Sequence, residues 1–172
     1  MNASTQLCPL TDAHRPVVER LWQLYSHDLS EFRGSMPDAE GRYKPGRLPL
    51  YFDDPDRCGY LSVRDSAPAG FVLVRGFAGD RRIIGEFFVV RAARRQHVGH
   101  EAAAQVLAMH PGCWEIAFQE ENPGAARFWR RVATEVVGPA WRVESRPVPG
   151  KPDVPPDTWL LLTAARGTDQ GL

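Results

Sequence analysis

Apolar residues recur at the spacing of an amphipathic helix in three segments of the chain, which begin near Pro16, Val98 and Pro123. The first segment is predicted to end at about Tyr25. The second is stopped by residues 110–112, His-Pro-Gly. The third has proline at its first position, which is a favoured start for a helix. The pattern therefore predicts three helices.

Shorter apolar runs predict β-strands at residues 7–10, 59–64, 70–75, 83–90, 114–119, 135–144 and 158–163. The second and third runs form a hairpin, because turn-forming residues separate them. Residues 26–49 are polar and interrupted by glycine and proline, and they predict a long loop. Loops of that length usually cover a site or are mobile.

The order of these elements predicts an α/β fold with one mixed central sheet of about six to seven strands and helices on both faces. The early strands are expected to be antiparallel and the middle strands partly parallel. The chain has 172 residues and no internal repeat, so residues 1–172 are predicted to form one domain.

Composition excludes several classes of partner. The formal net charge is zero, which argues against binding to nucleic acid or to an anionic membrane surface. No apolar run approaches the roughly 20 residues that span a bilayer, and the first residues do not resemble a secretory signal. The three cysteines are widely spaced and include no CxxC pair, as expected for reduced thiols. We therefore expect a cytoplasmic protein.

The most informative segment is residues 85–105, where a strand leads through an arginine-bearing turn into a helix that opens near Gly99. Exposed backbone N–H groups and the helix dipole both favour an anion at such a helix N-terminus. The segment therefore predicts a binding site for a phosphate-bearing ligand.

Two motifs in this region resemble those of the GNAT superfamily of N-acetyltransferases. The family's Gln/Arg-x-x-Gly-x-Gly/Ala signature for the pyrophosphate of acyl-CoA falls on residues 94–99, Arg-Arg-Gln-His-Val-Gly. The family's Asn-x-x-Ala-x-x-Phe/Leu-Tyr helix is similar to Asn122-x-x-Ala125-x-x-Phe128-Trp129. The resemblance covers about residues 59–137 and implies a GNAT-like fold that uses acetyl-CoA as cosubstrate.

Two residues depart from the family pattern. His97 stands where the family has its first glycine, and a side chain is a handicap there if the backbone adopts a positive φ. The histidine still supplies a backbone N–H, and its ring is a further donor to a phosphate. Trp129 stands where the family often has a tyrosine that protonates the departing thiolate. Either another group or water does that work, or coenzyme A leaves as the thiolate.

The resemblance also implies which residues hold the cofactor. The backbone of Phe88, Val89 and Val90 is expected to meet the pantetheine arm and the acyl carbonyl. The pyrophosphate is expected at the turn and first helical residues, Arg94, Arg95, Gln96, His97, Val98, Gly99 and His100. Asn122 contacts the pantetheine arm or only caps its helix. Trp129 is expected beside the cofactor's sulfur.

Acyl transfer to an amine needs a base, because alkyl ammonium groups titrate near pH 10. Glu86 is the candidate, since it lies in an otherwise apolar strand where partial burial raises a carboxyl pKa. The alternative is a strand carboxylate that faces solvent or pairs with an arginine. For the amine acceptor we expect Tyr25, Asp28 and Glu31, which follow the first predicted helix and include acidic groups suited to a cation.

The five histidines do not form a metal-binding set, because only His97 and His100 lie one helical turn apart and no third ligand has a matching spacing. We expect no metal. The sequence thus predicts an acetyl-CoA-dependent N-acetyltransferase that acts on the amine of a small molecule by direct attack in a ternary complex. The alternative is a catalytically degenerate domain that binds acyl-CoA as a sensor or partner module. A homodimer paired through a late strand such as residues 158–163 is a further hypothesis.

Overall fold

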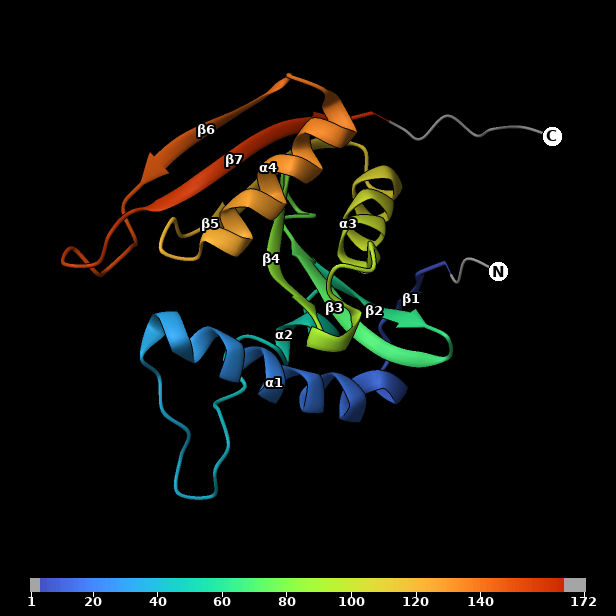
Figure 1. Cartoon of the computed structure of the whole chain (residues 1–172), viewed down its shortest axis with the longest axis vertical. Helices are drawn as coiled ribbons and strands as arrows, with labels where there is room; N and C mark the ends of the chain where they lie inside the picture. Colours follow the sequence, from blue (N-terminus) through green and yellow to red (C-terminus); the bar gives the residue numbers. More distant parts are fainter. Residues whose placement is uncertain (1–3, 166–172) are drawn as a thin grey trace.

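The computed structural model describes residues 4–165 (Figure 1). Seven strands form one sheet in the order β1-β2-β3-β4-β5-β7-β6. Their bounds are β1 Gln6–Pro9, β2 Arg57–Arg64, β3 Ala67–Arg75, β4 Arg81–Val89, β5 Gly112–Phe118, β6 Trp141–Arg146 and β7 Asp157–Ala164. The β4–β5 pair is parallel and the other neighbouring pairs are antiparallel. The predicted mixed α/β sheet is confirmed.

Helices cover both faces of this sheet. They are α1 Arg15–Arg33, α2 Leu50–Asp53, α3 Val98–Met109 and α4 Pro123–Val137, with short 3₁₀ turns at Asp12–His14 and Arg91–Ala93. One core cluster joins α3 and α4 to the sheet around Val106, Trp114 and Val132. A second joins α1 and α2 to the sheet around Val18 and Phe71. No helix within residues 4–165 is long and apolar enough to span a membrane.

Strands β4 and β5 part halfway along their length. Their pairing covers only Arg81–Ile84 of β4 against Cys113–Ile116 of β5. Beyond it, β4 stays paired to β3 but has no partner strand among the described residues on its other side. A bulge at Gly85 shifts the β3–β4 register at this point, since Leu73 pairs with Glu86 and Val74 with Ile84. The parting opens the sheet at one end.

Gly85 leaves room at the bulge for the Tyr51 side chain. A Cβ added at Gly85 would lie 2.0 Å from the Tyr51 hydroxyl oxygen.

Past the bulge, the Val90 amide donates to the Ala69 carbonyl at 2.8 Å. Because peptide groups alternate in direction along an antiparallel strand, the amides of Phe87 and Val89 face the opening between β4 and β5.

Helix α1 is longer than predicted. The sequence predicts an end at about Tyr25, but the helix continues to Arg33 and ends at Gly34, whose φ of +63° closes it. The polar residues after Tyr25 lie on a helix rather than in a loop, because the buried residues of α1 carry the helix across the sheet while polar side chains face outward. The predicted loop at residues 26–49 therefore begins only at residue 34.

The predicted strand at residues 135–144 was wrong in its first half. Helix α4 extends to Val137, and Val136 and Val137 pack against the core from it. β-branched residues mimic a strand pattern there, but burial keeps them helical. Strand β6 begins at Trp141. Strand β7 lies between β5 and β6, so residues 158–163 have both edges occupied and are not free to pair with another copy. This corrects the expectation of a dimer through that strand.

Candidate active site

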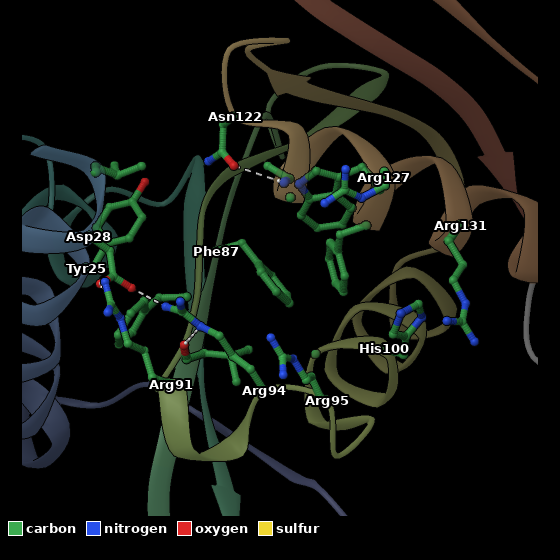
Figure 2. Close-up of a pocket in the computed structure, with 18 of the residues that line it drawn as sticks. Tyr25, Asp28, Phe87, Arg91, Arg94, Arg95, His100, Asn122, Arg127 and Arg131 are labelled. Atoms are coloured by element: carbon green, nitrogen blue, oxygen red, sulfur yellow. Dashed lines mark hydrogen bonds and ion pairs between the residues drawn. The ribbon is translucent and has the colours of Figure 1, made fainter. Parts of the chain in front are cut away.

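A cavity of about 940 Å³ lies at the opening between β4 and β5 (Figure 2). Helix α1 supplies one wall and the start of α4 the other, with the end of β4, the following turn and the start of α3 between them. The residues that line it are Tyr25, Asp28, Leu29, Glu31, Phe32, Phe87, Phe88, Val89, Arg91, Arg94, Arg95, His97, Gly99, His100, Asn122, Gly124, Ala125, Arg127, Phe128, Trp129 and Arg131.

The N-terminus of α3 faces this cavity and leaves backbone amides available to a ligand. No side chain caps it, and the first amides of a helix have no acceptor within the helix. Gly99 allows α3 to pack closely against the Phe128 ring, because a Cβ added there would lie 3.1 Å from that ring. The free amides and the helix dipole favour a phosphate at this point.

The turn before α3 is built with unusual backbone conformations. Arg95 has a φ of +65° and His97 a φ of +62°, both in the left-handed region that favours glycine. Histidine is one of the residues that enter this region more readily than most. The backbone at His97 therefore does have the positive φ at which the sequence analysis expected a side chain to be a handicap.

We expect His97→Gly to be more stable than His97→Ala by roughly 1 kcal/mol, because only the alanine keeps a Cβ at positive φ. Both variants lack the imidazole ring, so a change in affinity for acetyl-CoA common to the two reports the ring alone. Urea denaturation and calorimetric titration measure the two effects separately. Equal stability of the glycine and alanine variants would contradict a left-handed residue 97.

Positive charge is concentrated on the cavity. Five arginines line it, against the two carboxylates of Asp28 and Glu31, although the chain as a whole has no net charge. Within residues 4–165, neither Arg95 nor Arg127 forms an ion pair with a carboxylate. The excess of cations makes the cavity attractive to a polyanion such as a nucleotide bearing several phosphates.

Asp28 joins α1 to the turn after β4. It accepts hydrogen bonds from Arg91, with Nη2 2.9 Å from Oδ1, and from Arg94. Burial pushes the pKa of Asp28 upward, but the hydrogen bonds from Arg94 and Arg91 outweigh burial and hold the pKa below its usual range. Arg94 also donates from Nε to the Val89 carbonyl at 2.9 Å. Asp28 thus lies at the cavity as a paired carboxylate.

The other wall carries arginine and histidine around one carboxylate. Arg131 Nε donates to Glu135 Oε1 at 2.8 Å, and His100 Nδ1 lies 2.9 Å from Oε2 of the same residue. Glu135 thereby ties α3 to α4. Figure 2 shows Arg127 and Arg131 on this wall, facing Tyr25 and Asp28 across the cavity.

Three aromatic rings form the apolar part of the cavity. Phe87 packs against Phe128 and Trp129 with ring centroids 5.3 and 4.9 Å apart. Phe128 and Trp129 meet at 4.9 Å. This aromatic wall suits an uncharged, slender ligand chain. Such a chain would run from the arginines of the cavity to the point where β4 and β5 part.

Glu86 lies on the α1 side of β4, half-buried, and accepts a hydrogen bond from the Tyr25 hydroxyl. Burial raises the pKa of Glu86 above its usual range, although the hydrogen bond from Tyr25 and the charges of Arg33, Arg47 and Arg75 oppose the shift. Burial and the charge of Glu86 likewise raise the pKa of Tyr25 well above that of an ordinary tyrosine. A carboxylate held in this way is a stronger base than one in water.

Most of the predicted site residues line this one cavity. They are Tyr25, Asp28, Glu31, Phe88, Val89, Arg94, Arg95, His97, Gly99, His100, Asn122 and Trp129. Asn122 also caps α4, with Oδ1 3.1 Å from the Ala125 amide.

Four predicted residues do not line the cavity: Glu86, Val90, Gln96 and Val98. The Val90 amide is used within the sheet, as described above. Gln96 turns back to donate to the Ala92 carbonyl, and the Val98 side chain is fully buried. Glu86 lies behind Tyr25.

Six polar or aromatic residues of the cavity were not among the predicted site residues: Phe32, Phe87, Arg91, Arg127, Phe128 and Arg131. One signal was available for the two arginines of α4, because they are one helical turn apart and follow the asparagine that caps the same helix. As to metals, the described residues contain no group of three or more His, Cys, Asp or Glu side chains arranged to hold an ion.

Comparison with known proteins places this geometry in context. The sequence model of the acetyltransferase (GNAT) family matches residues 19–133. No curated protein matches the chain in sequence.

Solved structures share its fold. An acetyltransferase from Thermus thermophilus is similar with a TM-score of 0.68 and 17% identity, over 93% of this chain and 97% of that one. The ribosomal-protein-S18-alanine N-acetyltransferase from Escherichia coli has a TM-score of 0.63 and 9% identity, over 98% and 99%. The ribosomal L7/L12 α-N-protein acetyltransferase RimL, in complex with coenzyme A, has a TM-score of 0.65 and 12% identity, over 94% of each chain.

Proposed function

Because the chain belongs to the acetyltransferase (GNAT) family, we propose that it transfers the acetyl group of acetyl-CoA to the amine of a small molecule. The transfer is direct, within a ternary complex of protein, acetyl-CoA and acceptor. One observation carries the proposal: a single cavity runs from the uncapped N-terminus of α3, past an aromatic wall, to the parted strands beside Tyr25 and Glu86.

The residues of this cavity fit coenzyme A. The first amides of α3 and the guanidinium of Arg95 suit the pyrophosphate, while Arg127 and Arg131 add positive charge on the opposite wall. The amide of Val89, which faces the opening, suits a carbonyl of the pantetheine arm or of the acyl group. Acetyl-CoA supplies an activated acyl group on a good leaving sulfur.

Glu86 is proposed as the general base that takes the proton of the acceptor ammonium. Its partial burial and its raised pKa suit that role at neutral pH. Asp28, paired with two arginines, serves in this proposal to hold α1 against the turn rather than to bind a cation. Glu31 is exposed at the same wall and is proposed to attract a cationic acceptor.

The second candidate is an acyl-CoA-binding domain without turnover. Two observations favour it: the strained His97 in the phosphate turn, and Trp129 in place of an acidic hydroxyl at the aromatic wall. The class of the amine acceptor is also part of the proposal and is to be tested. The structurally similar E. coli enzyme is named for a ribosomal-protein alanine. A peptide with a free N-terminal amine therefore belongs beside small amines in any acceptor panel.

We expect acetyl-CoA to stabilise the protein, by about 2.7 kcal/mol at 100 times its dissociation constant. Differential scanning fluorimetry measures the shift, with adenosine as the control ligand.

Arg127→Glu is expected to weaken binding of acetyl-CoA about tenfold or more, because it reverses a charge on the cavity wall. Arg20→Glu makes the same change of charge at an exposed position of α1 outside the cavity and is expected to bind as the wild type does.

Release of free thiol in the presence of a panel of amines then separates the two candidates. Turnover with any amine supports the enzyme, and binding without turnover across the panel supports the sensor. No stabilisation by acetyl-CoA would contradict both.

A further inference from the structure

The candidate base is hydrogen-bonded to a side chain that lines the cavity. Glu86 does not line the cavity, whereas Tyr25, which donates its hydroxyl hydrogen to the Glu86 carboxylate, does. Tyr25 is itself only 8% exposed. Its ring packs between Trp22, Phe71 and Phe88, with ring centroids 5.2 to 5.9 Å away. This packing holds the Tyr25 ring in place, with its hydroxyl on the Glu86 carboxylate and the residue in the cavity wall.

We infer that the Tyr25 hydroxyl is the proton conduit between the acceptor amine in the cavity and the carboxylate of Glu86. This inference rests on the proposed acetyl transfer. It assigns Tyr25, which the sequence suggested only as part of the acceptor wall, a catalytic role. Glu86 is then the final acceptor of the proton, and Tyr25 is the group that contacts the substrate amine.

A phenol suits this task because one oxygen both donates and accepts a hydrogen bond. As the ammonium N–H bond breaks, its proton goes to the Tyr25 oxygen, and the proton already on that oxygen goes to Glu86. The phenol is neutral before and after the transfer. The high pKa of Tyr25 agrees with a conduit, because a free tyrosinate at neutral pH is disfavoured.

The proton balance of the whole reaction closes through the same path. The neutral nitrogen forms the C–N bond as the C–S bond breaks, and its second proton neutralises the departing sulfur. Glu86 returns the first proton through Tyr25 to solvent once the products leave. No acidic hydroxyl is needed at the aromatic wall, which accounts for a tryptophan at position 129.

A second tyrosine near Glu86 provides a matched control. The Tyr51 hydroxyl lies against Gly85, and its pKa is raised by burial and by the charge of Glu86. Tyr51 does not line the large cavity but a separate one of about 380 Å³ bounded by Asp12, Arg57 and Tyr60. Tyr51 lies near the same carboxylate, on α2, but it does not line the cavity in which the acceptor is proposed to bind. The other charged groups around Glu86 are Arg33, Arg47 and Arg75.

The test is a double-mutant cycle read through the pH profile of kcat, using the full chain and the best amine of the panel. We expect Tyr25→Phe to lower kcat about 10²-fold or more and to remove the acidic limb of the profile, as Glu86→Gln does. The KM for acetyl-CoA is expected to stay within about twofold, because neither substitution changes the α3 amides or the arginines proposed to bind its phosphates. The double variant is expected to be no slower than the worse single variant, since the two groups act as one unit. Tyr51→Phe is expected to keep both kcat and the limb.

Two outcomes would overturn the conduit: a Tyr25→Phe enzyme that keeps the acidic limb, or losses that multiply in the double variant. Should Tyr25→Phe fold poorly, 3-fluorotyrosine at position 25 keeps the shape and makes the phenol more acidic. A conduit then requires a changed kcat, and an unchanged kcat would contradict it. A wild-type protein without turnover on any amine would overturn the proposed function as well, whereas an active wild type with an indifferent Tyr25 overturns the conduit alone.

Discussion

Glu86→Gln is expected to lower kcat by about 10²- to 10⁴-fold while the dissociation constant of acetyl-CoA stays unchanged. The amide keeps the size of the side chain and its place beside Tyr25, but it cannot take up a proton. The acidic limb of the kcat profile, which reports protonation of Glu86, is expected to vanish. Steady-state kinetics between pH 6 and 9 and a calorimetric titration measure the two quantities.

The same substitution is expected to stabilise the folded protein at neutral pH. The folded-state pKa of Glu86 is raised, so folding favours its protonated form. The stability contributed by that form is fully present below the unfolded pKa and is lost as the pH rises through the folded one. Glutamine stays neutral and avoids this loss. Melting temperatures of the variant and the wild type should therefore agree in acid and diverge in favour of the variant at higher pH.

Glu19→Gln is the matched control, because Glu19 is exposed on α1 and lies outside the cavity. It is expected to change neither kcat nor the pH dependence of stability. Full turnover of Glu86→Gln across pH 6 to 9 would show that another group is the base.

Gly70→Ala is expected to destabilise the protein by about 3 kcal/mol or more, which corresponds to roughly 6–12 °C in Tm for a domain of this size. Gly70 pairs with Val89 where β4 borders the cavity. A Cβ added at Gly70 would lie 2.0 Å from the Phe88 carbonyl oxygen and 2.9 Å from its carbon. Both atoms belong to the backbone, so the clash is relieved only by separating β3 from β4.

Because β3 supports the edge of the opening, the same variant is expected to bind acetyl-CoA more weakly than the wild type. Thermal denaturation with and without acetyl-CoA measures both effects. Gly79→Ala is the control, since an added Cβ there meets no atom within 4 Å. It is expected to leave Tm unchanged or to raise it slightly. A Gly70→Ala protein as stable as Gly79→Ala would contradict the β3–β4 register.

The elements predicted from sequence were most accurate where the signal is local. The turn from β4 into α3 and the start of α4 follow from contiguous residues, the arginine turn and the Asn122-Pro123 start. The end of α1 and the α4–β6 boundary were mispredicted, because contacts with distant segments accompany the last turns of both helices. Leu29 packs against one core cluster and Asp28 pairs with Arg91 and Arg94, while Val136 and Val137 pack against the other cluster. Propensity alone does not carry that information.

The cavity shows the same division. The end of the cavity at the N-terminus of α3 follows from one continuous segment, whereas its other walls bring together residues far apart in the chain. Asp28 and Arg91 are 63 positions apart and Tyr25 and Glu86 are 61 apart, yet each pair is in contact. Nothing in the local pattern around Asp28 distinguishes a carboxylate that is free to bind an amine from one that two arginines neutralise.

By itself, the sequence determined the fold class, the resemblance to acetyltransferases and the position of the turn proposed to bind phosphate, because each depends on short stretches whose periodicity or motif is visible along the chain. The tertiary structure decided which side chains share the cavity, that His97 has a positive φ, and that Glu86 is hydrogen-bonded to Tyr25. The physical reason is that burial, ion pairing and pKa depend on distances between segments that only folding brings together.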